Sequence, residues 1–531
     1  MFIDLIKKIK INKKKIFFSK KKINEINYSV ADIEYAKKYI NSNNFNKIED
    51  YFPNKFLIKK IYPLKYDPRK DFPKAVQTVI YGCGYSGKKI AKQLISNGSK
   101  VDYFIDDDIK KIGKQVQDIK VISFEYLKII SQYKKISSII ITIPSLNQRK
   151  IFSLISKIAP LCNSISALPE KRIYKEKKIE IGDIQKISLE DIFNRSFFEI
   201  KNSSLYRFKN KKILITGGCG SIGFEICKQL LKSNPKKIIV LDHSELSVYR
   251  FNQKLKNNKI DLFLGDVKDQ ILIKNIIDKY RFDFIFHAAA YKHVKFLETN
   301  ILSAIDNNIF GTYAILKAIK NKKTNFIFIS TDKAVKPKNI LGMTKRIGEI
   351  LTQMTSLNKE YKKNKISIVR FGNVIGSDGA ALPLFVDQIK KNLPISITDI
   401  KMKRYFMSIK EACSLVIQSS ELTSKGNIFV LDMGKQIKII EIIKRLFDIY
   451  KKPEQSLKLR IIGNKYNEKI SENLFLSKKY LKSKYEKVFI VKEPMPNNKS
   501  FYSLLDKLKQ NVKEYNPKKA NLNLKFFFKS T

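Results

Sequence analysis

Residues 211–231, KKILITGGCGSIGFEICKQLL, decide the fold of the larger part of this 531-residue chain. They read as an apolar strand, a glycine turn and an amphipathic helix. In this pattern Gly217 makes the tight turn, Gly220 lets a pyrophosphate approach the backbone, and Gly223 lets the helix pack closely on the strand. The TGxxGxxG spacing predicts a dinucleotide site made by Thr216, Gly217, Gly220, Ser221, Ile222 and Gly223.

Three further elements follow on successive strands. The strand KKIIVLD ends at Asp242, roughly 20 residues beyond the turn, where a carboxylate binds the ribose hydroxyls of NAD and would repel the 2′-phosphate of NADP. The segment DLFLGDVKD places Asp266 and Val267 beside an adenine. The alanines of FDFIFHAAAYKHV could face the cofactor or serve tight helix–sheet packing. Their order along the chain favours NAD binding, with the last contacts from Ala288, Ala289 and Ala290.

The next strand and helix, NFIFISTDKAVKPKNILGMTKRIGE, carry the reactive groups. Short-chain dehydrogenases have a Ser or Thr at this strand end and a YxxxK on the helix, so that Tyr and Lys face the nicotinamide one turn apart. Here the lysine is Lys345, but Leu341 stands in place of the tyrosine and cannot transfer a proton. This disfavours an alcohol dehydrogenase or an ordinary epimerase. The candidate reactive residues at the strand end are Thr331, Asp332 and Lys333.

An earlier unit, residues 73–175, begins with the strand and turn TVIYGCGYSG, whose glycines form a GxGxxG. Its second strand ends in three aspartates, residues 106–108, which could bind a ribose or form a solvated acidic turn. We therefore expect an α/β protein with two Rossmann-like, doubly wound parallel-sheet domains. The remaining segments are a Lys-rich N-terminal stretch (1–72), a connector (176–208), a catalytic domain with a smaller C-terminal substrate-binding part (209–493), and a tail (494–531).

The formal charge of +55 could suggest nucleic-acid binding, but only 12 of the 104 basic residues are Arg and the lysines are spread along the chain. We expect no nucleic-acid partner. Attachment of the basic N-terminus to an anionic membrane surface stays open.

The five cysteines show no metal-ligand spacing, and no stretch approaches the roughly 18–20 apolar residues that span a bilayer. The expectations are a soluble, cytoplasmic protein, no metal and a homo-oligomer.

Six motifs carry a specific resemblance: TGGCGSIGFEI, HAAAYKHV, STDKAVKPKNILGMTK, VRFGNVIGSDGAALPLF, MKRYFM and GNIFVLDMG. They resemble the bacterial polysaccharide-biosynthesis UDP-N-acetylglucosamine 4,6-dehydratases of the capsular and flagellin-glycosylation group, which are extended short-chain dehydrogenases/reductases. The resemblance covers residues 76–493. Longer members typically have Met in place of the catalytic Tyr, so an apolar Leu341 is similar to the family. They also usually carry N-terminal membrane helices, which are not expected here.

The resemblance implies a lyase for surface polysaccharide or glycan synthesis that uses NAD to remove water from a UDP-N-acetylhexosamine, most simply UDP-N-acetylglucosamine. Hydride leaves sugar carbon 4, water leaves from carbons 5 and 6, and hydride returns to carbon 6. By resemblance Lys333 is the base at carbon 5 and Asp332 the acid at the 6-hydroxyl. Thr331 would hold the 4-oxygen, and Lys345 the nicotinamide ribose.

The resemblance also implies substrate contacts. Asn373 and Arg404 would bind the UDP moiety, since a guanidinium fork matches a diphosphate. Lys292 and Glu298 either lie near the sugar or form a solvated loop pair. The departures from the family pattern, which bear on substrate preference, are Asp378 for Arg, Lys295 for Pro, and GNKYNEK for GLRPGEK, in which Glu468 and Lys469 remain.

Three alternatives remain open. A UDP-sugar 4-epimerase or a dehydratase that also inverts carbon 5 would use the same cofactor site, although Leu341 argues against the epimerase. A non-catalytic scaffold that binds nucleotide-sugars would keep the glycines and lose the reactive groups. Asp332, Lys333 and Lys345 are all present, which favours an enzyme.

Overall fold

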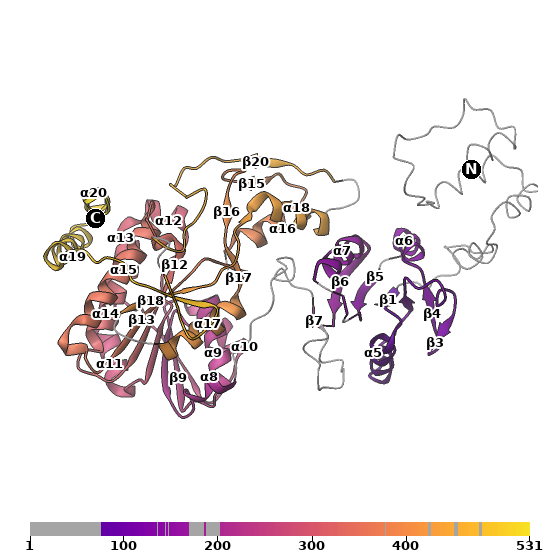
Figure 1. Ribbon diagram of the computed structural model, residues 1–531, viewed down its shortest axis with the longest axis horizontal. Coiled ribbons are helices and arrows are strands. Elements are labelled where there is room, and N and C mark those ends of the chain that lie inside the picture. The colour runs from indigo at the N-terminus through magenta and orange to yellow at the C-terminus, as the bar shows by residue number, and fades with distance from the viewer. Residues whose placement is uncertain are drawn as a thin grey trace, which may run out of the picture.

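The computed structural model describes residues 76–134, 136–143, 145–146, 148–168, 185–186, 202–377, 379–422, 426–450, 455–476 and 480–530 (Figure 1). The predicted N-terminal stretch, most of the connector and Asp378 lie outside these residues. In the described part, two separate mainly parallel sheets are each flanked by helices, so the prediction of two doubly wound α/β domains is confirmed.

The first sheet has the strand order β3-β4-β2-β1-β5-β6-β7. Its central strands pair in parallel, and the short β3 and β7 pair antiparallel at the two edges. The strands are β1 (Val76–Tyr81), β2 (Tyr103–Ile105), β3 (Gln115–Val116), β4 (Ile119–Ile122), β5 (Ile136–Ile141), β6 (Cys162–Ala167) and β7 (Gln185–Lys186). The helices are α5 (Tyr85–Ser96), α6 (Phe124–Tyr133), α7 (Gln148–Ile158) and the short η3 (Ala159–Leu161).

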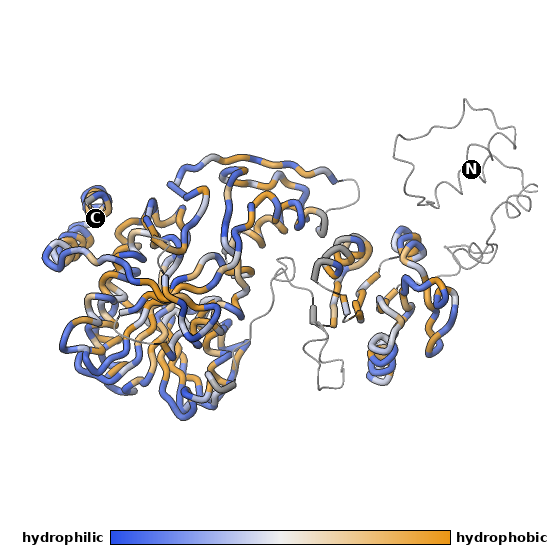
Figure 2. Tube along the Cα trace, in the orientation of Figure 1, coloured by the Kyte–Doolittle hydropathy of each residue, from blue (hydrophilic) through white to orange (hydrophobic). Residues whose placement is uncertain are grey.

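The second sheet has the order β10-β9-β8-β11-β12-β13-β18-β22-β21, which is the order 3-2-1-4-5-6 of a dinucleotide-binding fold extended by three strands. Only β22 and β21 run antiparallel to their neighbours. Its strands are β8 (Lys212–Thr216), β9 (Lys237–Asp242), β10 (Ile260–Leu264), β11 (Phe284–His287), β12 (Asn325–Thr331), β13 (Lys365–Phe371), β18 (Asn427–Leu431), β21 (Leu481–Lys482) and β22 (Val488–Val491). The central strands are almost entirely apolar (Figure 2), because helices cover both faces of such a sheet.

Side-chain caps set several of the flanking helices. Asp269 accepts hydrogen bonds from two amides at the start of α11, Asn339 caps α15, and Ser408 caps α17. The helices are α8 (Asn202–Tyr206), α9 (Ser221–Leu231), α10 (Glu245–Lys254), α11 (Gln270–Tyr280), α12 (Val294–Thr299), α13 (Ile301–Ile305), the π-helical turn η7 (Asp306–Phe310), α14 (Gly311–Ala318), η8 (Asp332–Ala334), α15 (Ile340–Leu357), η9 (Lys359–Tyr361), α17 (Ile409–Ser419) and η10 (Ser420–Leu422).

A smaller part lies beside the carboxyl edge of the second sheet and has its own core, which includes Phe385, Phe406 and Leu446. It consists of three two-stranded sheets and two helices. Its elements are β14 (Asn373–Ile375), α16 (Ala381–Lys390), β15 (Ile395–Ile397), β16 (Lys403–Arg404), β17 (Phe406–Ser408), β19 (Ile437–Lys438), α18 (Ile439–Tyr450) and β20 (Leu459–Ile461).

The segment expected as a tail forms two helices, α19 (Asn498–Lys513) and α20 (Pro517–Ser530). One face of α20, made by Ala520, Leu524 and Phe527, is buried and joins the core of the second domain. No helix among the described residues is both long and apolar enough to cross a bilayer.

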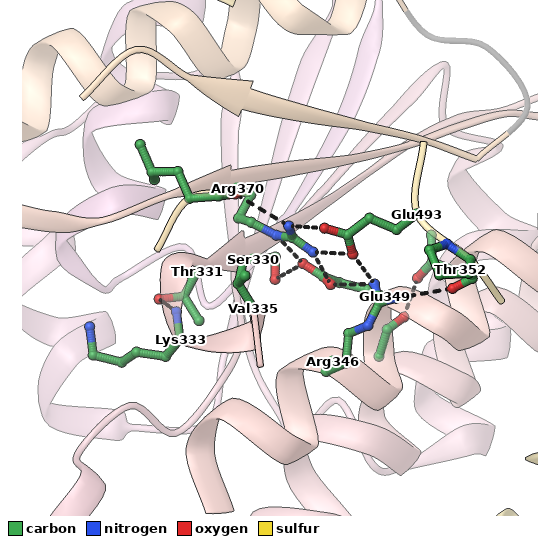
Figure 3. Close-up of polar contacts among 12 residues, drawn as sticks. Ser330, Thr331, Lys333, Val335, Arg346, Glu349, Thr352, Arg370 and Glu493 are labelled. Atoms are coloured by element: carbon green, nitrogen blue, oxygen red, sulfur yellow. Dashed lines mark hydrogen bonds and ion pairs between the residues drawn. The ribbon is translucent and has the colours of Figure 1, made fainter. Parts of the chain in front are cut away.

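A buried ion network joins three parts of the second domain (Figure 3). The guanidinium of Arg370 on β13 binds the carboxylates of Glu349 on α15 and Glu493 after β22, each through two hydrogen bonds of 2.7–3.0 Å. Arg346 lies 2.8–3.0 Å from the same two carboxylates, and Ser330 donates a 2.6 Å bond to Glu349. The network therefore fixes α15 against the strand end that carries the predicted reactive residues.

Removal of Arg370 should destabilise this domain strongly. In Arg370→Met the buried carboxylates of Glu349 and Glu493 lose their main counter-charge, and we expect a loss of about 3–5 kcal/mol in the free energy of unfolding. Arg346→Met, the matched control, should cost less because Arg370 still neutralises both carboxylates. Urea unfolding followed by circular dichroism measures both. Equal stabilities of Arg370→Met and the wild type would refute this account.

Candidate functional site

The glycine turn after β8 has the geometry of a dinucleotide cradle. Gly217 has φ +62°, and a Cβ on it would lie 2.6 Å from the Cα of Ala289. A Cβ on Gly223 would lie 2.5 Å from the carbonyl oxygen of Gly217, so only glycine allows α9 to start this close to the turn. Gly220 is the N-cap of α9, and the first amides of this helix, from Ser221 onward, point toward the turn. The cradle fits a pyrophosphate.

Asp242 ends β9 beside this cradle. Its side chain accepts hydrogen bonds from the amides of Cys219, at 3.1 Å, and Ser244, at 3.1 Å. These bonds hold the carboxylate at the edge of the glycine turn, where the ribose hydroxyls of a dinucleotide would reach it. The position matches the sequence-based prediction for NAD.

The remaining predicted cofactor residues follow the neighbouring strands. Val267 is buried against Gly311, whereas Asp266 is half-buried and shares the ammonium of Lys268 with Asp306 at 3.3 Å. Ala288, Ala289 and Ala290 follow β11 directly, and the amide of Ala288 donates to Thr216 at 3.0 Å. Two further hydrogen bonds fix Thr216 and Ile222. The Thr216 hydroxyl bonds the ring of buried His287, and the carbonyl of Ile222 accepts from the thiol of Cys413.

The predicted reactive residues Thr331, Asp332 and Lys333 are brought together with Asn373. The Lys333 ammonium lies 3.1 Å from Asp332 Oδ1 and 3.0 Å from Asn373 Oδ1, and the Thr331 hydroxyl donates to Asp332 at 3.0 Å. Asp332 is fully buried, and its Oδ2 has no hydrogen-bond partner among the described residues. This oxygen is itself buried and faces Gly372, on which a Cβ would lie 2.9 Å from it. In Figure 3 Lys333 points away from the ion network of Arg370.

A second carboxylate, Glu472, lies near the Lys333 ammonium. Glu472 is 2% exposed, and its oxygens lie 3.8 Å from the Lys333 ammonium and 3.3 Å from that of Lys469. Lys469 also donates a 2.5 Å bond to the carbonyl of Val335. Burial alone would lower the pKa of Lys333, but the charges of Asp332 and Glu472 together hold that pKa above its usual value. Lys333 is therefore an ammonium in the ligand-free chain.

Lys345, on α15, is buried against β12, the strand that precedes Asp332. Its ammonium donates a 2.6 Å bond to the carbonyl of Ile329 and lies 4.1 Å from the centre of the Phe328 ring. Burial lowers the pKa of Lys345 to about 7, against the opposing charge of Glu349. Near neutral pH this side chain can therefore hold or release a proton. Leu341, one turn earlier, is buried and apolar, so it supplies no proton to this site.

The predicted substrate residues have mixed placements. Buried Arg404 donates to the carbonyls of Lys403 and Ile470 at 2.8 and 3.2 Å and lies 3.7 Å from Glu468. Glu298 accepts a 2.7 Å bond from the amide of Ile340, at the start of α15. It therefore anchors that helix through one of its oxygens.

Of the other predicted positions, Lys292 is exposed on the loop after β11, and Lys295 is exposed on α12. Asn373, expected to bind UDP, instead bonds Lys333 in this structure.

Two residues at the site were not predicted. One is Glu472, which lies outside every recognisable motif. The other is Asn308, which is buried in the π-helical turn η7. Its side chain bonds both the amide and the carbonyl of Tyr291, at 2.8 and 3.2 Å, and the hydroxyl of Thr344 at 3.2 Å. It thereby joins the loop after β11 to α15. A π-turn has no reliable sequence signature, so no pattern in the chain pointed to this residue.

Comparisons with known proteins agree with this geometry. A family model described as "Polysaccharide biosynthesis protein" matches residues 213–493. Capsular polysaccharide biosynthesis protein CapD of Staphylococcus aureus is 35% identical over 430 residues, which are 78% of this chain and 71% of CapD. UDP-glucose 4-epimerase of Rickettsia rickettsii is 33% identical over 283 residues, covering 51% and 80% of the two chains. The solved structure of Pen from Bacillus thuringiensis is similar with a TM-score of 0.51, at 32% identity over 54% of this chain and 90% of Pen.

The glycine cradle can be tested by one added side chain. Gly223→Val should lower the amount of NAD bound at saturation by one molecule per chain, because the valine would push α9 away from the carbonyl of Gly217. Equilibrium dialysis measures this. Cys227→Ala, one turn further along the same helix, is the control and should bind as the wild type does. Full NAD binding by Gly223→Val would show that the cradle does not hold the dinucleotide.

Proposed function

We propose, on the premise that the chain belongs to the polysaccharide biosynthesis protein family, that it catalyses the NAD-dependent 4,6-dehydration of a UDP-N-acetylhexosamine, most simply UDP-N-acetylglucosamine. The observation that carries this proposal is the pair of buried Asp332 and partly buried Lys333 at the carboxyl end of β12. Dehydration needs an acid and a base beside one hexose. An apolar residue at position 341 removes the usual proton carrier of an epimerase.

The glycine cradle, Asp242 and the alanines after β11 would hold NAD. The chemistry that bound NAD supplies is removal of hydride from sugar carbon 4 and its return to carbon 6. The resulting 4-ketone acidifies the proton on carbon 5. Lys345 would steady the nicotinamide ribose, and Thr331 the sugar 4-oxygen. Arg404 lies on the adjoining strand β16, where its guanidinium fork would bind the diphosphate of UDP.

The hydrogen bond between Lys333 and Asp332 resolves the apparent conflict between a protonated lysine and a lysine base. A substrate that excludes water from this buried pair favours its neutral form, in which the Lys333 proton has moved 3.1 Å to Asp332. The Lys333 amine then takes the proton from carbon 5. Asp332 gives its proton to the departing 6-hydroxyl, which leaves as water. The two transfers restore the original ion pair. The proton of the 4-hydroxyl would pass to the neutral amine of Lys345 as the 4-ketone forms, and the Lys333 ammonium, after exchange with solvent, would return a proton to carbon 5 when hydride reaches carbon 6.

Glu472 is a second counter-charge, beside Asp332, that raises the proton affinity of Lys333. It comes from the segment after GNKYNEK, so the C-terminal part of the domain completes the site. With Lys469 it continues an alternating row of charges, Asp332, Lys333, Glu472 and Lys469. Such a row holds the Lys333 side chain in one direction.

Incubation with UDP-N-acetylglucosamine in deuterated water tests the reaction. We expect a product lighter by one water, with deuterium at carbon 5, detected by mass spectrometry and NMR. Lys333→Ala should lose this activity by at least about 10³-fold and still bind NAD, whereas Lys338→Ala, an exposed lysine six residues after Asp332, should stay active. Activity retained by Lys333→Ala would overturn the assignment of the base.

The similarity to UDP-glucose 4-epimerase favours an alternative reaction, epimerisation at carbon 4. The same experiment distinguishes it from dehydration. An unchanged product mass with inversion at carbon 4 would replace dehydration by epimerisation. A dehydrated product with inverted carbon 5 would identify the 5-inverting dehydratase. Tight UDP-sugar binding with no product would identify a non-catalytic scaffold.

Glu472→Gln should move the acidic limb of the kcat–pH profile to lower pH, on the order of one unit. Loss of the Glu472 charge, which raises the pKa of Lys333, lowers the affinity of the Asp332–Lys333 pair for a second proton, so the singly protonated pair that supplies the neutral amine persists at lower pH. Glu468→Gln, the control, removes a carboxylate that pairs with Arg404, and should leave the limb in place. A limb that moves to higher pH, or does not move, in Glu472→Gln would contradict the role of Glu472.

A further inference from the structure

The first domain repeats the cradle of the second. Gly82 follows β1 with φ +106°, as Gly217 follows β8 with φ +62°. A Cβ on Gly87 would lie 1.9 Å from the carbonyl oxygen of Gly82, just as one on Gly223 would lie 2.5 Å from that of Gly217. The N-cap of each following helix, α5 and α9, is a glycine with an extended backbone. The two turns differ in length by one residue but place the helix start in the same relation to the strand.

The carboxylate at the end of the second strand is also repeated. Asp106 Oδ2 accepts a 2.8 Å bond from the amide of Cys83 in the glycine turn, as Asp242 Oδ2 accepts a 3.1 Å bond from Cys219. In both aspartates Oδ1 accepts from the amide two residues further along the chain, at 2.9 and 3.1 Å. Each carboxylate is thus locked at the rim of its glycine turn. Lys111, 3.0 Å from Asp106, offsets part of its charge.

A cavity of about 510 Å³ adjoins this carboxylate. It lies at the carboxyl ends of β1, β2, β4 and β5, and β1 is where the strand order of this sheet reverses. Ligands of open parallel sheets bind at such a point. Its walls combine the apolar faces of Phe124, Ile143 and Leu154 with two cations, Lys150 and Lys157. Three carboxylates also line it: Asp106, Asp107 and Glu125. Volumes of this size hold drug-sized ligands.

We propose that the first domain binds a ribonucleotide in this cavity, separately from the dinucleotide of the second domain. The base would lie against Phe124 and Ile143. The ribose hydroxyls would donate to Asp106, and the phosphates would face Lys150 and Lys157, the two cations that line the cavity. The aspartate run of residues 106–108 is then a ribose site and not only a solvated turn. No step of the dehydration passes through this cavity.

Counting adenine nucleotides tests this proposal. Bound NAD is released by denaturation and quantified, and additional binding of ADP to the native chain is measured by equilibrium dialysis. We expect a sum of two nucleotides per wild-type chain and of one for Asp106→Asn. The matched variant Asp242→Asn should also lose one. A wild-type sum of one, or a sum of two for Asp106→Asn, would overturn the second site.

The outcomes separate the two sites. Loss in Asp106→Asn without loss in Asp242→Asn would support the cavity and refute the proposed NAD site, and the reverse would refute the cavity alone. A further binding measurement uses only the wild-type chain, so its result does not depend on whether a variant folds. For chains with NAD already bound, 2′-deoxy-ADP should bind at least about 10-fold more weakly than ADP, because the hydrogen bond to the Asp106 carboxylate is lost. Equal affinities would refute the ribose contact.

Discussion

The position of the reactive groups depends on Arg370, a fully buried guanidinium between two carboxylates. Helix α15 carries Lys345 and Leu341, and β12 delivers Asp332 and Lys333. The Glu349 carboxylate joins them, since it accepts from both Arg370 and Ser330. A buried pair of this kind gains little net stability over apolar packing, but it is strict about geometry. Burying these charges costs free energy. In return the network holds a helix and a strand end in one relative position, on which the proposed chemistry depends.

A second charged group, Asp332 with Lys333, differs from the Arg370 network in how fully its hydrogen bonds are satisfied. Both carboxylates of the Arg370 network accept hydrogen bonds on both of their oxygens, whereas Asp332 Oδ2 has no hydrogen-bond partner among the described residues. A buried oxygen without a hydrogen-bond partner costs free energy. A substrate that donates a hydrogen bond to this oxygen would recover that free energy. The domain therefore has an unsatisfied oxygen where we propose that a sugar binds. Stability and reactivity are thus assigned to two neighbouring ion groups.

Local patterns predicted the fold and part of the site. The spacing of Gly217, Gly220 and Gly223 reports on contacts within a dozen residues, so the sequence shows the turn directly. The order of strands extends that prediction to Asp242 and to the Thr331–Lys333 loop. Glu472 could not be predicted, because it meets Lys333 only after the chain has folded back over about 140 residues, and such pairs leave no periodic signal. The bonds of Asn373 to Lys333 and of Glu298 to Ile340 were hidden for the same reason.

The π-helical turn η7 makes the number of residues in its helix matter as well as their identity. One extra residue is accommodated between α13 and α14, and it turns Asn308 toward Tyr291 and Thr344. Deleting a single residue here would let the helix close into a regular α-helix at little local cost. The residues before the deletion would then rotate by roughly 100° relative to the residues after it. A deletion here therefore changes the contacts of every residue on one side of it, whereas a substitution changes only the contacts of one side chain.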